Sequence, residues 1–279
     1  MIPQKNLSSL SNRLAQMGGR RIPETILERD YCLSWFLIGL SKSPLKNKLL
    51  FKGGTAIKKC YIADYRFSED IDFTLVEELA FEDIKKGLDV TYEQTHKTSG
   101  IKLKFDHQDR HSHQNSYTFF IAYEGPLPGT SNNKIKIDIT LREKIVFQTE
   151  EKPVIKEYSE YSDVPDDSNI CVYSLSEIAA EKVIALMDLA RNEPRDLYDV
   201  WYLTENKYVD VSELIDAINH KLEFRNKKLI NIKNEFSRKE ARLRKLWDMR
   251  LSMQMTTLPE FEGVYRAVRR EFRRAKLLI

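Results

Sequence analysis

Two aspartates on one predicted strand are the residues with the clearest potential for chemistry. Asp70 and Asp72 are two positions apart in a segment where apolar residues alternate with polar or small ones. Such alternation predicts a half-buried strand, on which residues two apart point to the same face. Two adjacent carboxylates repel each other unless a cation lies between them, and their oxygens suit Mg²⁺ or Mn²⁺ bound together with substrate phosphates. The pair predicts a metal site; an exposed polar strand end is the alternative.

A third carboxylate belongs to another alternating segment. Asp138 lies within residues 134–140, where isoleucines occupy every second position. If this second strand lies beside the strand of Asp70 and Asp72, three carboxylates meet. A triad of this kind supports two metal ions, one at the attacking oxygen and one at the leaving phosphate.

A pair of glycines follows a short apolar run. Lys52, Gly53, Gly54 and Thr55 come directly after Leu49–Phe51 and precede a helical pattern, which predicts a strand, a tight turn and a helix. Glycine lets backbone N–H groups approach a phosphate closely, and the start of the helix favours an anion. Because tight turns often need glycine for conformational reasons, the motif in isolation favours a purely structural turn.

The next candidates lie on two predicted helices further along the chain. Ser174 and Glu177 form a capping box that opens a helix, on which Lys182 is the only charge in an apolar stripe. Lys182 is either a lysine at the edge of the core or a cation for nucleotide phosphates. Because methionine would replace this lone and costly buried cation by an apolar group of similar shape, Lys182→Met should be as stable as the wild type or more stable, yet lose NTP affinity. Asp196 and Asp199 share one face of the following helix, as dipole partners or as site acids.

The pattern of predicted helices and strands around these residues indicates an α+β protein with a mixed sheet. The predicted helices are residues 5–17, 23–41 and 81–98, and the further strands are 101–105, 117–123 and 134–140. After residue 174 the pattern is helical throughout, with helices at 175–191, 195–204, 211–220, 222–246 and 257–277. We therefore expect N-terminal helices in 1–44, a core in 45–173 and a helical C-terminal domain in 174–279.

Composition excludes several classes of protein. The chain has 279 residues, of which 42% are hydrophobic and 31% charged, enough for a substantial core. It has no apolar run of about 20 residues and no secretory signal pattern, so we expect a cytoplasmic protein without a membrane contact. Its three cysteines form no C-x-x-C pair, which argues against a disulfide framework. The polar segment with His107, His111 and His113 is predicted to be an exposed hairpin connection rather than a metal site.

The charge is distributed unevenly. From Lys221 to the C-terminus, 17 Lys and Arg stand against 7 Asp and Glu, whereas the rest of the chain is net acidic. A concentrated positive field attracts polyanions, of which nucleic acid is the obvious one. On the last predicted helix the arginines follow a spacing of three and four, which favours one basic side for RNA; a solvated amphipathic helix is the alternative. The arginines are Arg266, Arg269, Arg270, Arg273 and Arg274.

The order of these motifs resembles that of AbiEii/AbiGii-type nucleotidyltransferase toxins, the family that includes the mycobacterial MenT toxins. The resemblance covers residues 45–204. It rests on Lys52-Gly-Gly-Thr-Ala, Arg66-Phe-Ser-Glu-Asp-Ile-Asp-Phe, the isolated Asp138, Glu181-Lys-Val-Ile-Ala-Leu and Arg195-Asp-Leu-Tyr-Asp. It implies a DNA polymerase β-like nucleotidyltransferase core followed by a helical C-terminal part.

The resemblance also implies roles for the residues in the motifs. Asp70 and Asp72 would hold the metal, Lys182 would meet the phosphates, and Asp196 would be an acidic residue of the catalytic site. Either Asp196 or Asp138 would receive or steer the proton of the attacking hydroxyl. The nucleotide would be held by Lys52, Gly53, Gly54, Thr55, Arg66, Ser68, Lys182 and Asp199. The sequence departs from the family pattern in two places: Glu69 stands between Ser68 and Asp70, and Asp138 is a looser match as a metal ligand.

Together these observations predict an enzyme that transfers a nucleoside monophosphate from an NTP to the 3′ end of an RNA, with tRNA as the favoured acceptor. It would act in a toxin–antitoxin or abortive-infection system, with a cognate antitoxin as partner. Two alternatives stay open: a GTP- or NTP-binding regulator without transfer, and a nucleic-acid-binding module in which the basic end is the active part.

Overall fold

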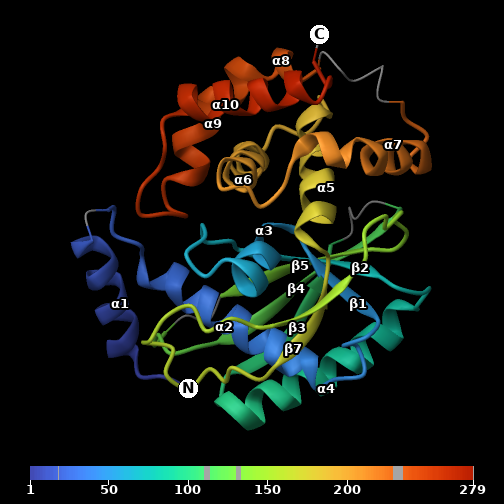
Figure 1. Cartoon of the computed structure of the whole chain (residues 1–279). Coiled ribbons are helices and arrows are strands. Elements are labelled where there is room, and N and C mark those ends of the chain that lie inside the picture. The colour runs from blue at the N-terminus through green and yellow to red at the C-terminus, as the bar shows by residue number, and fades with distance from the viewer. Residues whose placement is uncertain (18, 110–113, 130–132, 229–234, 279) are drawn as a thin grey trace. The chain divides into compact units, whose positions relative to one another are not determined.

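The computed structural model describes residues 1–17, 19–109, 114–129, 133–228 and 235–278. The chain divides into two compact units (Figure 1). The first unit comprises Met1–Arg142 and Thr149–Val172, and the second comprises Glu143–Gln148 and Tyr173–Ile279. A short segment from the middle of the chain therefore belongs to the C-terminal unit.

A seven-stranded mixed sheet forms the centre of the first unit, and its strand order is β3-β4-β5-β2-β1-β7-β6. Neighbouring strands are antiparallel except for two parallel pairs, β2 with β5 and β1 with β7. The predicted α+β class with a mixed sheet is confirmed. The strands are β1 (Leu49–Lys52), β2 (Asp70–Leu75), β3 (Lys102–Gln108), β4 (Ser116–Glu124), β5 (Lys134–Thr140), β6 (Glu150–Pro153) and β7 (Asn169–Val172).

Three long helices accompany the sheet: α1 (Gln4–Gln16), α2 (Glu24–Ser41) and α4 (Phe81–Ser99). α2 is apolar around most of its circumference and is almost completely buried, because it packs against α1, α4 and β7. α4 contacts β3 and ends at Gly100, whose φ of 76° is the left-handed conformation that commonly terminates a helix. Figure 1 shows α2 and α4 side by side.

The turn after β1 leads into α3 (Gly53–Ala56), which continues as a π-helix over Ile57–Tyr61. Both lysines of the π-helix are fully buried. Lys59 forms ion pairs with Asp30 at 2.9 Å and Glu157 at 2.6 Å, whereas Lys58 donates to the hydroxyl of Tyr158 at 3.2 Å. These contacts fix the helix that follows the two glycines.

In the part of the second unit that the structure describes, regular structure is helical. α6 (Pro194–Glu205) packs against α5 (Leu175–Met187), α9 (Glu240–Leu251) and α10 (Phe261–Arg274). A short 3-10 helix (Val211–Leu214) leads into α7 (Ile215–Phe224), and α8 (Glu235–Arg238) precedes α9. α10 buries Phe261, Val264, Tyr265, Val268 and Phe272 on one side. No described helix is both long and apolar enough to cross a membrane.

Several predicted elements differ from the structure. The expected continuous helix over 222–246 is wrong, because α7 ends at Phe224 and Asn226 adopts a left-handed φ of 55°. The strands β6 and β7 were not predicted, since both are short. β3 extends to Gln108, so His107 is a strand residue that stacks on Phe120 rather than a loop residue. His111 and His113 lie outside the described residues.

Candidate active site

The glycine turn and the β2 aspartates come together in the first unit. β1 and β2 are antiparallel, and their register places Lys52 opposite Asp72. Gly53 has a φ of 79°, and a Cβ atom on it would lie 2.5 Å from Oδ2 of Asp72. Only glycine leaves room for this approach, because any side chain would displace the carboxylate. The two motifs, 15 or more residues apart in sequence, are therefore parts of one local site.

The hydroxyl groups near the turn serve to join its two sides. Thr55 is 1% exposed, and its Oγ1 donates to the carbonyl oxygen of Asp70 at 2.5 Å. The hydroxyl oxygens of Thr55 and Ser68 lie 2.7 Å apart. These bonds tie the start of α3 to the start of β2. The basic residues of the motifs, Lys52 and Arg66, are both buried in this unit.

Three carboxylates and one lysine share a face of the neighbouring strands β2 and β5. The parallel register places Asp72 opposite Asp138 and Asp70 opposite Lys136. Oδ1 of Asp138 accepts from the Thr118 hydroxyl at 2.5 Å, and Oδ2 accepts from Lys136 Nζ at 2.6 Å. Partial burial lowers the pKa of Lys136, but its bond to Asp138 and its attraction to all three aspartates outweigh this effect and raise it.

The adjacency of β2 and β5 was a condition for the predicted triad, and the structure meets it. Among the described residues, however, no three His, Cys, Asp or Glu side chains are arranged to hold a metal ion. Asp70 and Asp72 are half-buried on one face of β2, and their hard oxygens fit a Mg²⁺ or Mn²⁺ ion that also binds substrate phosphates. The role of Asp138 as a ligand stays a prediction, since Thr118 and Lys136 engage its oxygens.

A second cluster of predicted site residues lies in the second unit. Lys182 of α5 forms ion pairs with Asp196 at 2.7 Å and with Asp199 at 2.8 Å, both of α6. The lysine side chain is 12% exposed and the two carboxylates 2% and 0%. Arg191 also binds Asp196, with Nε 2.6 Å from Oδ2. The apolar stripe around Lys182 thus contains a paired cation, which contradicts the expectation of a buried lysine without a partner.

The electrostatics of this cluster keep Asp196 ionised. Burial raises the pKa of this carboxyl, but attraction to Lys182 and Arg191 and their hydrogen bonds outweigh burial and lower it to about 2. A carboxylate so strongly held by cations is a weak proton acceptor. Within the second unit its evident effect is to orient Lys182 and Arg191.

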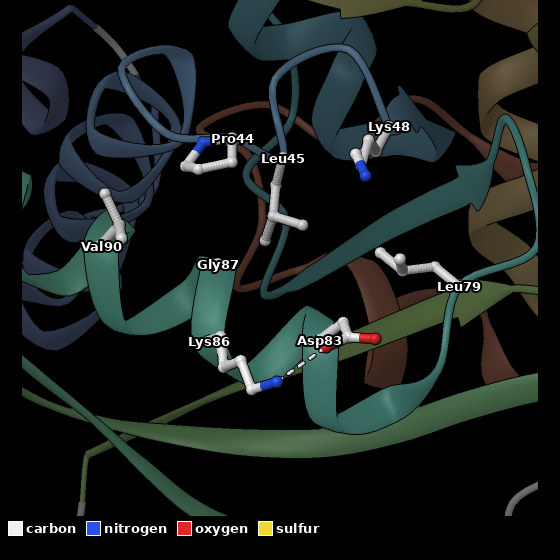
Figure 2. A pocket seen from close by; sticks show the side chains of 8 residues that line it. All are labelled: Pro44, Leu45, Lys48, Leu79, Asp83, Lys86, Gly87 and Val90. Carbon is white, nitrogen blue, oxygen red and sulfur yellow. Dashed lines mark hydrogen bonds and ion pairs between the residues drawn. The ribbon is translucent and has the colours of Figure 1, made fainter.

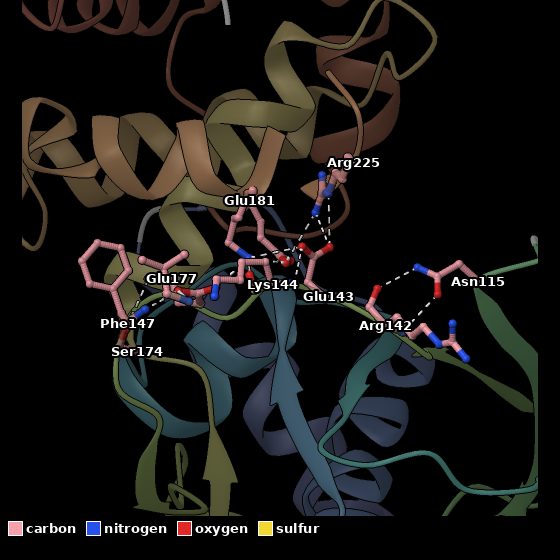
Figure 3. A network of polar contacts seen from close by, with 11 residues as sticks. Asn115, Arg142, Glu143, Lys144, Phe147, Ser174, Glu177, Glu181 and Arg225 are labelled. Atoms are coloured by element: carbon pink, nitrogen blue, oxygen red, sulfur yellow. Dashed lines mark hydrogen bonds and ion pairs between the residues drawn. The ribbon is translucent and has the colours of Figure 1, made fainter. Parts of the chain in front are cut away.

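A buried polar network holds the segment Glu143–Gln148 against α5 and α7 (Figure 3). Lys221 is fully buried and pairs with Glu177 at 2.6 Å and Glu181 at 3.2 Å. Glu177 accepts from the backbone N–H groups of Val146 at 3.1 Å and Phe147 at 2.9 Å. The predicted cap is confirmed, because Ser174 Oγ accepts from the N–H of Glu177. The Glu177 carboxylate, however, binds the distant segment.

Some residues of these clusters were missed in the sequence. Lys136 could have been found, because it is two positions from Asp138 on an alternating strand and must share its face. Arg191 gave no signal, since it precedes α6 in an irregular segment. Lys221 was counted only as part of the basic end of the chain.

The arginines of α10 fall into two groups. Arg266, Arg270 and Arg273 are exposed, whereas Arg269 is only half-exposed and its Nε is enclosed without a hydrogen-bond partner among the described atoms. The neighbouring Arg274 instead pairs with Asp210 and Glu271, each at 2.9 Å.

A separate pocket of the first unit contains none of the predicted site residues. This cavity of about 260 Å³ lies between the segment before β1 and the start of α4. Figure 2 shows the side chains that line it. Leu45, Leu79 and Val90 make it largely apolar, and Lys48 and Lys86 add charge. The candidate site is therefore distinct from this pocket.

Comparison with known proteins identifies relatives over most of the chain. The model of the family described as nucleotidyl transferase AbiEii toxin, type IV toxin–antitoxin system, matches residues 35–274. No curated protein sequence matches the chain. The nucleotidyltransferase toxin MenT4 of Mycobacterium tuberculosis has a similar structure, with a TM-score of 0.64 at 16% identity over 97% of this chain and 90% of that protein.

A crystal structure of a candidate nucleotidyltransferase from H. pylori is also similar, with a TM-score of 0.52 at 15% identity over 92% of this chain and 97% of that one. At these identities the two structures establish a common fold. The family model spans well over half of the sequence and confirms the resemblance of its motifs. This chain therefore belongs to the AbiEii family of nucleotidyltransferase toxins.

Proposed function

We propose that this protein transfers a nucleoside monophosphate from an NTP to the 3′-hydroxyl of an RNA, and that the acceptor is tRNA. The observation that carries the proposal is the contact between Asp72 and Gly53, which combines a carboxylate pair with a phosphate-binding type of turn. Membership of the AbiEii family supports the class of reaction. In this setting catalysis consists of positioning and charge neutralisation.

Asp70 and Asp72 would hold Mg²⁺ or Mn²⁺, with Asp138 as a further candidate ligand. A bound divalent ion would neutralise the negative charge that develops on the triphosphate. The backbone N–H groups of Gly53 and Gly54 would approach the phosphates. Thr55 and Ser68 would act through the turn, because their hydroxyls bond to each other and Thr55 bonds to the Asp70 carbonyl. Lys52 and Arg66 are proposed to add positive charge at the nucleotide.

Lys182 would contact the NTP phosphates. Asp196 and Asp199 would position it, because both carboxylates lie within 2.8 Å of its Nζ. A cation fixed by two buried acids loses little conformational freedom when the substrate binds. We assign to Asp196 an orienting role on Lys182 and Arg191 rather than proton transfer, since its pKa is lowered to about 2.

The proposal also includes an RNA-binding surface on α10 and a cognate antitoxin. The exposed arginines Arg266, Arg270 and Arg273, with Arg269 beside them, would attract the RNA phosphates. The family description implies a toxin–antitoxin system, so a cognate antitoxin would restrain the activity in the cytoplasm.

The proposal is tested by incubating the protein with each labelled NTP, total RNA, and Mg²⁺ or Mn²⁺. One NTP should label RNA of tRNA size, and the label should be lost in Asp72→Asn. The matched control is Asp89→Asn, an exposed aspartate on α4 of the same unit, which should retain activity. NTP binding without labelled RNA would instead support a regulator, and label on protein would contradict an RNA acceptor.

A further inference from the structure

An open groove of about 390 Å³ lies between the end of α6 and the start of α10 in the second unit. We call it the α6–α10 groove and define it by Trp201, Glu205, Gly263, Arg266 and Arg270, which all line it. Its volume is in the range of about 300–1,000 Å³ that is usual for sites that bind small groups. None of the residues proposed to bind metal or NTP lines it.

Gly263 lines the groove and has free space beside it. It lies in the first turn of α10, and a Cβ atom on it would meet no described atom within 4 Å. Glycine destabilises a helix relative to alanine, so local stability gives no reason for it at this position. Packing among the described residues gives none either, because none of their atoms lies within 4 Å of the Cβ position. The consequence of this glycine is room on the groove side of α10.

The positive charges at the groove are available for a ligand. Among the described residues, Arg266 has no acidic partner, and Arg270 has only Glu271 at 3.9 Å. Arg274, by contrast, is engaged by Asp210 and Glu271 within the fold. The α10 side of the groove belongs to the segment of the chain with a large excess of Lys and Arg, whereas Glu205 and Glu260 also line the groove. The two exposed arginines on the α10 side are complementary to phosphate groups.

The aromatic wall of the groove suits a flat group. Trp201 is half-exposed, whereas Trp35 and Trp247 are each 3% exposed. The indole is supported by Tyr198, with ring centroids 5.6 Å apart. An aromatic ring beside cations is the combination by which proteins bind unpaired nucleotides, because bases stack on the ring and phosphates face the charges. Glu205 adds an acceptor for an exocyclic amino group.

We infer that the α6–α10 groove binds an unpaired nucleotide of the RNA, with the base on Trp201 and the flanking phosphates near Arg266 and Arg270. The inference rests on the proposed function for the identity of that RNA as the acceptor. It adds a base-binding site to the electrostatic contacts of α10, so binding should depend on the bases as well as on the phosphates.

The test measures binding by fluorescence anisotropy without NTP, using the full-length protein. The probes are a labelled single-stranded oligo(A) and an abasic strand of the same length. Gly263→Phe fills the groove at a position with free space and should weaken oligo(A) binding about tenfold or more, as expected for loss of a stacked base. Gly263→Ala should have a much smaller effect. The matched control is Met249→Phe, which adds an aromatic ring at an exposed site outside the groove and should bind as wild type.

Two further measurements make the result independent of folding and of catalysis. Trp201→Leu removes the stacking ring without filling the groove and should also weaken oligo(A) binding. This variant keeps the test decisive if Gly263→Phe fails to fold. The abasic strand should bind the wild-type protein less tightly than oligo(A), and its affinity should change little in Gly263→Phe.

The inference is overturned if folded Gly263→Phe and Trp201→Leu bind oligo(A) like wild type. It is also overturned if the abasic strand binds as tightly as oligo(A), or if the wild-type protein binds neither strand; in that last case a protein partner would become the better occupant. Base-dependent binding in the groove, together with no nucleotide transfer to any RNA, would support this inference and contradict the proposed function.

Discussion

The carboxylate of Asp72 lies against the backbone of Gly53, so close that a Cβ atom on the glycine would be 2.5 Å from Oδ2. The contact joins the turn after β1 to the carboxylate pair of β2. A glycine at a turn or an aspartate on a strand is common in proteins and can have a purely structural role. Such separate roles do not require the two residues to lie close together, so their contact is stronger evidence for a functional site than either motif alone.

The first prediction tests this contact. Gly53→Ala should lose nucleotide transfer and some stability, because the new methyl group must displace Asp72 and the backbone keeps a positive φ. Gly129→Ala is the control, since Gly129 has a φ of 78° and no described atom within 4 Å of a Cβ. The control should lose only about 1–2 kcal/mol from its unfavourable φ and stay active. Equal activity of both variants would show that the contact is unimportant.

The second prediction concerns Lys182. The structure reverses the expectation that Lys182→Met is tolerated, because it leaves the buried carboxylates of Asp196 and Asp199 without their shared cation. We expect a loss of about 3–5 kcal/mol in the free energy of unfolding by urea. Lys102→Met removes an exposed pair with Glu124 and should cost less than about 1 kcal/mol. Similar losses in the two variants would argue against a buried pair.

The third prediction follows from the lowered pKa of Asp196. Its pKa is about 2 in the folded protein and about 3.9 in an unfolded chain, so between these values the unfolded chain binds more protons. The contribution of the carboxylate is therefore complete above about pH 5 and is lost as the pH falls towards 2. The difference in unfolding free energy between wild type and Asp196→Asn should shrink by about 2 kcal/mol over that range. A constant difference would show that Asp196 has an ordinary pKa.

The fourth prediction concerns Lys136. Its ammonium group faces Asp138 and is attracted by Asp70 and Asp72, so it opposes the binding of a metal cation to these carboxylates. Lys136→Gln should bind Mn²⁺ several-fold more tightly in an electron paramagnetic resonance titration, while Lys102→Gln, an exposed control, should not. Unchanged Mn²⁺ affinity in Lys136→Gln would place the metal elsewhere.

The fifth prediction separates the arginines of α10. Replacing Arg266, Arg270 and Arg273 together by Gln should lower the slope of log K for single-stranded RNA against log salt by about 0.7 for each phosphate that these arginines neutralise in the wild-type complex. NTP affinity should not change. Arg274→Gln removes a cation that is already paired with Asp210, so its slope should stay close to that of wild type. A triple variant with the wild-type slope would leave this face of α10 as a structural or antitoxin-docking surface, with the RNA held elsewhere.

The sequence predicted the features that depend on neighbouring residues, but not those that depend on contacts between elements far apart in the chain. Asp70 and Asp72, the glycine turn and the Ser174 cap are local patterns, and the structure contains each at its predicted position. The partners of Lys182 and Asp138 depend on other elements. A helical stripe shows which side of α5 is buried but not that α6 presents two acids to it. Thr118 reaches Asp138 only through the pairing of β4 with β5. The family resemblance supplied the order of the motifs without these contacts.

The segment Glu143–Gln148 has a practical consequence for dividing the protein. It is part of the second unit although the rest of that unit begins at Tyr173. A C-terminal fragment expressed from Tyr173 onwards would lack Glu143 and the backbone of Lys144, Val146 and Phe147. Lys221 and Glu177, both fully buried, would then lose these partners. A soluble helical fragment therefore requires circular permutation or a linker that restores the segment. Simple truncation would leave the buried charges of Lys221 and Glu177 without part of their hydrogen-bond and ion-pair partners.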